Sequence, residues 1–128
     1  MSSETNIAYL AGVIDGEGSI FINSFKAYCL RISNTDLFLI EKLKEILLSE
    51  GIEVHIYEAG NNTQGKNWKK GYQLQMTRKS EIIKVLNKII PFLISKKMRA
   101  EIMRDAIEGK ITHIDAFTKL KLLNRKGV

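Results

Sequence analysis

Apolar residues follow two different periods along this chain, and the change between them marks the expected elements. Residues 18–34 alternate with a period of two, which predicts a hairpin with its turn near 24–27. Residues 52–57 and 68–78 alternate in the same way and predict two more strands. Helical spacing predicts helices from residue 5 or 6 to 17, over 37–49 and over 79–90. It predicts two more, one after residue 95 up to Gly109 and one over 111–123.

The predicted order is helix, two strands, helix, two strands, helix, and then further helices. This order indicates an α+β fold with an α-β-β-α-β-β-α core, a four-stranded antiparallel sheet and additional C-terminal helices. Each strand has one mainly aliphatic face, so we expect helices on one side of the sheet and an open, polar, saddle-like face on the other. At 128 residues and without an internal repeat, the chain is expected to form a single domain, residues 1–128.

The first helix ends in an unusual run, in which small residues precede two acids among glycines. Gly12 and Gly16 are four residues apart and therefore share one helix face, which would let another backbone approach closely. Glu17 ends the helix, and Gly18 is expected to stop it in the left-handed conformation. A carboxylate at the negative end of a helix favours a bound cation, although an ordinary buried helix with a glycine stop would carry the same pattern.

Residues 10–18 read Leu-Ala-Gly-Val-Ile-Asp-Gly-Glu-Gly and resemble the motif of the LAGLIDADG homing endonucleases. The chain carries one copy, so it is similar to the single-motif, homodimeric, intron-encoded group. The resemblance implies that Glu17 is a catalytic residue and a Mg²⁺ ligand, and that the Gly16 carbonyl is a further metal ligand. It also implies a dimer interface formed by Leu10, Gly12, Val13 and Gly16. Asp15 is expected to be structural.

Two later positions are matched to catalytic roles through the same resemblance. Asn34 follows the second strand, where the family often has a polar residue that orients solvent, and a plain turn residue or helix cap is the alternative. Lys96 matches the lysine that follows the third core helix of the family, with Lys97 as a rival one position later and a surface lysine as the alternative.

The open sheet face is expected to bind double-stranded DNA in the major groove. Strands of about eight or nine residues would span roughly 27–30 Å, or about eight or nine base pairs per protomer. A homodimer would then recognise a long pseudo-palindromic site. The candidate base-reading residues point outward from the strands: Ser19, Phe21, Asn23, Arg31, Ser33, His55, Tyr57, Gln73, Gln75 and Thr77. The candidate phosphate contacts are the lysines of turns and strand starts: Lys26, Lys66, Lys69 and Lys70. An ordinary solvated sheet face would also carry such residues.

Composition adds a few limits to this interpretation. The net charge of +6 and the isoelectric point near 9.5 favour a polyanionic partner, although a basic solvated surface has the same charge. The lone Cys29 fits an intracellular, reducing compartment, either cytoplasm or organelle. No run of about 18 apolar residues is present, so we expect no membrane partner. His55 and His113 lack partners at zinc-ligand spacing.

The leading hypothesis is a Mg²⁺-dependent, site-specific DNA endonuclease that acts as a homodimer. The alternatives are an RNA-splicing maturase, with intron RNA as its partner, and a DNA-binding protein without nuclease activity on the same scaffold. A basic structural α+β domain without a nucleic-acid role is a third alternative. DNA binding that is absent or insensitive to salt would favour that last one.

Overall fold

The computed structural model describes residues 3–23, 27–59 and 71–125. The elements follow the predicted order, with α1 (Ser3–Glu17), β1 (Gly18–Ile22), β2 (Tyr28–Asn34), α2 (Leu37–Ser49), β3 (His55–Ala59), β4 (Gly71–Met76), α3 (Lys79–Ile89), the 3₁₀ turn η1 (Ile90–Phe92), α4 (Lys97–Ile107) and α5 (His113–Arg125). The predicted α+β architecture is therefore confirmed. None of the described helices is long and apolar enough to cross a membrane.

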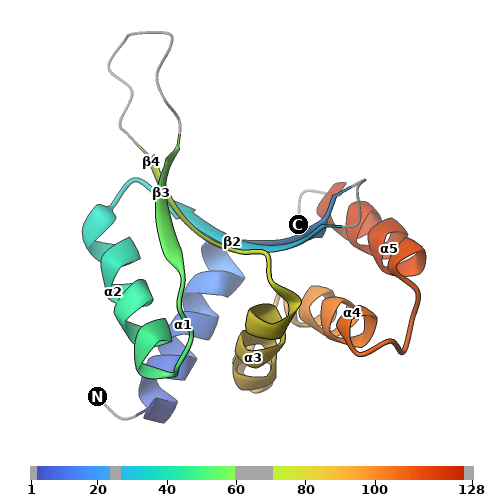
Figure 1. Ribbon diagram of the computed structural model, residues 1–128, viewed down its shortest axis with the longest axis horizontal. Helices are drawn as coiled ribbons and strands as arrows, with labels where there is room; N and C mark the ends of the chain where they lie inside the picture. Colours follow the sequence, from blue (N-terminus) through green and yellow to red (C-terminus); the bar gives the residue numbers. More distant parts are fainter. Residues whose placement is uncertain (1–2, 24–26, 60–70, 126–128) are drawn as a thin grey trace, which may run out of the picture.

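The four strands form one antiparallel sheet in the order β1-β2-β4-β3. Figure 1 shows a curved sheet with the helices on one side and no helix over the other face of its described part. The strand residues that point toward the helices are buried, as the alternation predicts, namely Ile20, Ile22, Tyr28, Leu30, Ile32, Leu74 and Met76. The sheet thus has one face in the core and one face open to solvent.

Two helix ends use glycine as predicted. Gly51 and Gly109 both have a φ of +80°, a conformation that glycine adopts without steric cost. The amide of Gly51 donates to the carbonyl of Leu48, and the amide of Lys110 donates to the carbonyl of Asp105. These bonds satisfy carbonyls in the last turns of α2 and α4 and end both helices.

The strands are shorter than expected. The predicted strand over 52–57 begins only at His55, because the opposite strand β4 ends at Met76, where the chain leaves the sheet for α3. Ile52 and Val54 are nevertheless buried, so the inward side of that pattern was identified correctly. The longest described strand has seven residues, which corresponds to about 23 Å at ~3.3 Å per residue, or roughly seven base pairs of B-DNA. The expectation of eight or nine residues per strand is wrong for the described part of the sheet.

Candidate functional site

The C-terminal end of α1 passes directly into β1, and a glycine makes this junction possible. A Cβ on Gly18 would lie 2.8 Å from both the Cγ2 atom and the carbonyl oxygen of Ile14. Gly18 does not have a positive φ; in the described part only Gly51 and Gly109 do. The predicted left-handed stop is therefore wrong, and close packing against the preceding turn is the reason for glycine at this position.

Glu17 is the last residue of α1 and is exposed to solvent. The side-chain amide of Asn34 donates to Glu17 Oε2 at 2.5 Å, and Asn34 Oδ1 accepts from the amide of Asp36 at 2.8 Å. Asp36 in turn caps α2 by accepting from Phe38 and Leu39. Asn34 is thus a turn residue before α2, as the alternative interpretation expected, and it also contacts Glu17. Its role in orienting solvent stays a prediction.

Asp15 fastens a distant segment of the chain to the end of α1. Its carboxylate accepts from the amide of Ile94 at 2.8 Å and from the amide of Lys96 at 3.0 Å. The Ser95 hydroxyl also donates to Asp15, at 3.3 Å to its carbonyl oxygen. Asp15 is therefore occupied by backbone groups, which matches the structural role expected for it.

Lys96, and not its neighbour Lys97, reaches the end of α1. Its Nζ donates to the carbonyl oxygen of Asp15 at 2.7 Å, whereas Lys97 is exposed at the start of α4. Burial lowers the pKa of Lys96, the nearby charge of Arg99 lowers it further, and Asp15 opposes the shift. The hydrogen bond holds the ammonium group at the carbonyl of Asp15, which precedes Glu17 by two positions in the sequence.

Arg99 connects this segment to the C-terminal helix and was missed by the sequence analysis. Its side chain is buried and donates to Asn124 Oδ1 at 2.9 Å, to the carbonyl of Ser95 at 3.2 Å and to that of Leu123 at 3.1 Å. The Asn124 amide donates to the carbonyl of Ile20 in β1 at 3.0 Å. The end of α5 is therefore tied both to the segment that carries Lys96 and to an edge strand.

α1 has two opposite faces with different surroundings. Its core face is formed by Ile7, Leu10, Ala11 and Ile14, all of which are buried. Its outward face carries Tyr9, Gly12, Val13 and Gly16, which line a shallow apolar hollow together with Glu17 and Leu39. A Cβ on Gly12 or Gly16 would meet no described atom outside the neighbouring helix backbone within 4 Å, so no described residue of the protomer requires glycine there.

One predicted interface residue lies on the wrong face. Leu10 is 1% exposed and packs inside the protomer, so it is not available to a partner. The expectation failed because α1 carries small or apolar residues on most of its sides, so the sequence pattern does not show which apolar face packs in the core. Gly12, Val13 and Gly16 are on the outward face.

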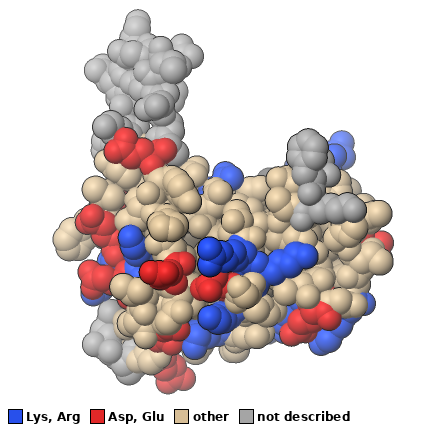
Figure 2. Space-filling model, viewed as in Figure 1, with Lys and Arg blue, Asp and Glu red and all other residues tan. Residues whose placement is uncertain are grey.

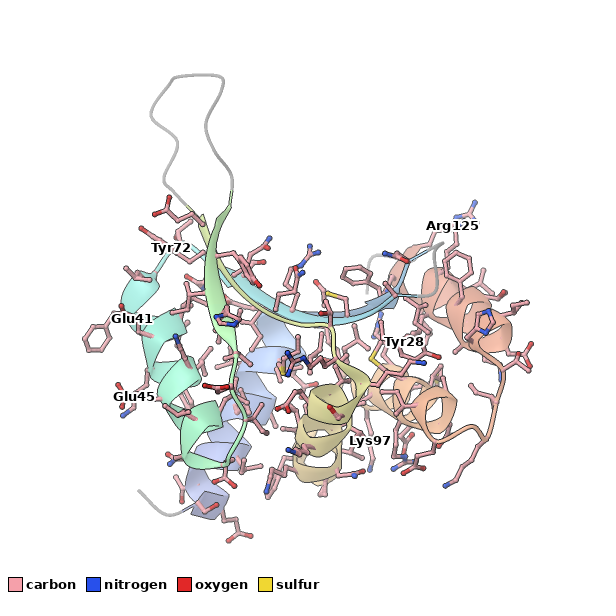
Figure 3. The ribbon with its side chains drawn as sticks, viewed as in Figure 1. Tyr28, Glu41, Glu45, Tyr72, Lys97 and Arg125 are labelled. Atoms are coloured by element: carbon pink, nitrogen blue, oxygen red, sulfur yellow. The ribbon has the colours of Figure 1, made fainter. Side chains whose placement is uncertain are left out.

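The predicted base-reading residues form rows across the open sheet face. The strand register places Ser19, Arg31, Gln75 and His55 in one row over all four strands, in that order. A second row consists of Ser33, Gln73 and Tyr57. Of the residues labelled in Figure 3, Tyr72 lies on the core side of β4 and Arg125 is the last residue of α5, so neither belongs to these rows. The sequence thus identified the outward positions correctly in these strands.

Phe21 lies next to the first row and contacts its arginine. The guanidinium carbon of Arg31 lies 5.0 Å from the centroid of the Phe21 ring, a cation–π distance. Cys29, opposite Phe21 in the register, is buried beside them. Burial raises the pKa of its thiol, and the charge and hydrogen bond of Arg31 oppose this. The aromatic residue on a polar face therefore supports an arginine.

The remaining predicted contacts fall outside the sheet or outside the described residues. Thr77 follows the end of β4, and Asn23 follows the end of β1, where its Oδ1 accepts from the Ala27 amide at 3.0 Å. Lys26, Lys66, Lys69 and Lys70 lie outside the described residues. Figure 2 shows basic and acidic side chains intermixed on the face in view, so the net positive charge is not gathered into one patch there.

The described residues include no group of three or more His, Cys, Asp or Glu side chains that could hold a metal ion. The carboxylate presented at the end of α1 is that of Glu17, beside the exposed Gly16. Carboxylate and carbonyl oxygens are the hard ligands that Mg²⁺ and Ca²⁺ prefer. The Glu17 carboxylate and the Gly16 carbonyl could supply some of the ligands of a divalent metal ion, and further ligands would be needed to complete its coordination.

Comparisons with known proteins agree with this architecture. The structure is similar to the homing endonuclease I-CvuI in complex with the I-CreI target in 2 mM Mg (TM-score 0.68, 18% identity, 97% of this chain and 80% of that chain). It is also similar to the archaeal intron-encoded homing endonuclease I-Vdi141I complexed with DNA (TM-score 0.68, 21% identity, 98% and 83%). A third similar structure is the meganuclease I-AabMI bound to uncleaved DNA (TM-score 0.64, 22% identity, 91% and 43%).

A search of curated protein sequences gives no significant match. The family model for the LAGLIDADG-like domain matches residues 4–90, which include the α1 motif, all four strands and helices α1 to α3. This match covers well over half of the 128 residues. The chain belongs to the LAGLIDADG-like domain family.

Proposed function

We propose that this chain is a site-specific DNA endonuclease that acts as a homodimer and requires a divalent metal, with Mg²⁺ as the physiological ion. The observation that carries the proposal is the position of Glu17, an exposed carboxylate beside the outward glycines of α1. Packing α1 against its copy would bring two such carboxylates together. A helix face without side chains permits that close approach.

Dimerisation is also supported by what the outward face of α1 leaves exposed. Tyr9 is 45% exposed and Phe38, in the neighbouring helix α2, is 81% exposed. Exposed apolar groups of this size are typical of an interaction surface, and Tyr9 lines the hollow itself. In the DNA-bound meganuclease I-AabMI, this chain covers only 43% of the polypeptide, which leaves room there for a second unit of similar size.

Glu17 and the residues near it would have different roles in catalysis. Glu17 and the Gly16 carbonyl would hold the metal, which when bound supplies charge neutralisation at the phosphate and lowers the pKa of a water. Asn34 holds the Glu17 carboxylate in place through its amide. Lys96, fixed on the carbonyl of Asp15, contributes a positive charge that stabilises negative charge developing on the phosphodiester.

The open sheet face would bind the duplex. Two protomers related by a two-fold axis present two such faces, so the site has two symmetric halves. The solved relatives I-CvuI and I-Vdi141I are complexes with DNA, which agrees with this assignment. The outward Arg, Gln, Ser and His side chains provide the donors and acceptors that reading base edges requires.

Selection of cleaved sequences from a randomised duplex pool tests the proposal. We expect Mg²⁺-dependent double-strand cleavage and a recovered site with two-fold symmetry. Binding of a symmetric site in Ca²⁺ without any cleavage in Mg²⁺ would support the non-cleaving alternative instead. Failure to select any sequence, together with tighter binding to a structured intron RNA than to duplex DNA, would overturn the proposal in favour of a maturase.

A further inference from the structure

Four side chains on the open face form a connected group around one arginine. We name it the Arg31 cluster, which consists of Phe21, Cys29, Arg31 and Gln75. Arg31 and Gln75 are directly opposite each other in the register of β2 and β4, and Arg31 Nε donates to Gln75 Oε1 at 3.1 Å. All members of the cluster are at least partly buried, although no helix covers this face.

The chemistry of the guanidinium fixes the orientation of the Gln75 amide. A guanidinium has five N–H donors and no acceptor, so the atom of Gln75 that faces Arg31 has to be the oxygen. The NH₂ group of Gln75 is consequently directed away from Arg31. A glutamine that reads adenine uses both its oxygen and its nitrogen, as acceptor and donor. The oxygen of Gln75 has two lone pairs, and the one bound to Arg31 fixes the direction of the amide, which makes Gln75 poorly placed for that bidentate contact.

Phe21 and Gln75 constrain Arg31 from two sides. The ring of Phe21, on the neighbouring strand β1, lies against the guanidinium, and Gln75 holds Nε. Nε–H is one of the five donors, so the contact with Gln75 leaves the four N–H donors of the two Nη nitrogens, of which the hydrogen bond to Cys29 needs no more than one. Guanine offers two adjacent acceptors, O6 and N7, in the major groove, and a fixed guanidinium matches them in a bidentate pair.

We propose that Arg31 reads one guanine in each half-site and that Gln75 is the residue that positions Arg31 for it, rather than an independent reader of adenine. This inference rests on the proposed binding of duplex DNA by the open face. It predicts that the preference for one base pair depends on two side chains from different strands. The ordinary expectation for Arg and Gln would be two independent preferences, one for guanine and one for adenine.

The test compares base preferences of variants on the selected site. Each position of the half-site is varied, and relative affinities are measured with Ca²⁺ as the metal. We expect Arg31→Ala to reduce the preference for one guanine by roughly 5- to 150-fold, the range of a good bidentate contact. Gln75→Leu is expected to reduce the preference at the same position. Gln75→Glu keeps an oxygen that accepts from Nε, so it should retain that preference whatever its overall affinity.

Gln73→Leu is the matched control. Gln73 is on the same strand and the same face, and the register pairs it with Ser33 and Tyr57 instead of Arg31. Its substitution should change a different position and leave the guanine preference intact. The inference is overturned if Gln75→Leu abolishes a separate adenine preference while the Arg31 position stays unchanged. It is also overturned if Gln75→Glu loses the guanine as fully as Gln75→Leu does. If the wild-type protein selects no symmetric DNA site at all, the proposed function itself has failed, which is a different outcome.

Discussion

The three glycines of the α1 motif should respond to alanine in opposite ways. A Cβ on Gly12 would meet no atom within 4 Å, whereas a Cβ on Gly18 would lie 2.8 Å from two atoms of Ile14. Glycine inside a helix is less stable than alanine by about 0.5–1 kcal/mol. We therefore expect Gly12→Ala to stabilise the isolated protomer by that amount. Gly18→Ala should destabilise it by about 1–3 kcal/mol, the usual cost of overpacking a core.

The same Gly12→Ala variant should weaken the homodimer. If the outward face of α1 packs against its copy, the added methyl groups separate the two helices. A cost of about 1–3 kcal/mol, as for overpacking in a core, corresponds to roughly 5- to 150-fold weaker self-association. Stability and assembly would then change in opposite directions for one substitution.

Two measurements separate these effects. Sedimentation equilibrium gives the dissociation constant of the dimer, and thermal unfolding is followed at concentrations where the protein is monomeric, because dimerisation itself raises the melting temperature. For a chain of this length, the stabilisation by Gly12→Ala corresponds to about 2–4 °C. Self-association within twofold of wild type would refute the assignment of this face to the dimer. A Gly12→Ala monomer less stable than the wild-type monomer would contradict the conclusion that a Cβ fits beside Gly12.

Two further predictions concern side chains that join distant parts of the fold. Hydrogen bonds from Ser3 and Lys88 lower the pKa of Glu50 in the folded protein. A lowered pKa stabilises the folded state at pH values above the pKa of the unfolded chain, and this stabilisation is lost as the pH falls through the folded-state pKa. Glu50→Gln should therefore be less stable than wild type at neutral pH and equally stable in acid, and a constant difference between the two in urea titrations at several pH values would contradict this. Arg99→Met removes at least three hydrogen bonds, to Asn124, Ser95 and Leu123, from a buried guanidinium and should cost roughly 3 kcal/mol in a urea titration. A loss below about 1 kcal/mol would contradict a stabilising role for these bonds.

Local periodicity predicted most of this fold because each strand and helix separates polar from apolar residues over a few positions. The hairpin of β1 and β2, the order of the elements and the outward positions of the sheet follow from the alternation in 18–34 and in the later strands. The strand ends did not follow from it. β3 begins only at His55 because the partner strand β4 ends at Met76, and this depends on tertiary structure.

The details of the site depended on contacts between residues far apart in the chain. Asp15 binds the Ile94–Lys96 segment across about 80 positions, and Arg99 meets Asn124 across 25. No local pattern contains such pairs. Sequence similarity could point to Lys96 over Lys97, but only the hydrogen bond to the Asp15 carbonyl shows which lysine reaches α1. For Leu10, the helix is apolar or small on most sides, so periodicity alone could not separate the core face from the outward face.

The exchange Glu17→Gln tests the central claim most directly. The variant keeps an oxygen that can accept from Asn34, so the local geometry is retained while the negative charge is removed. Dissociation constants in Ca²⁺ and single-turnover cleavage rates in Mg²⁺ are measured on the selected site, with Glu41→Gln on the exposed side of α2 as a control. The account predicts binding within about threefold of wild type and cleavage at least about 100-fold slower, as for the loss of a key electrostatic group. Cleavage by Glu17→Gln at the wild-type rate would contradict it.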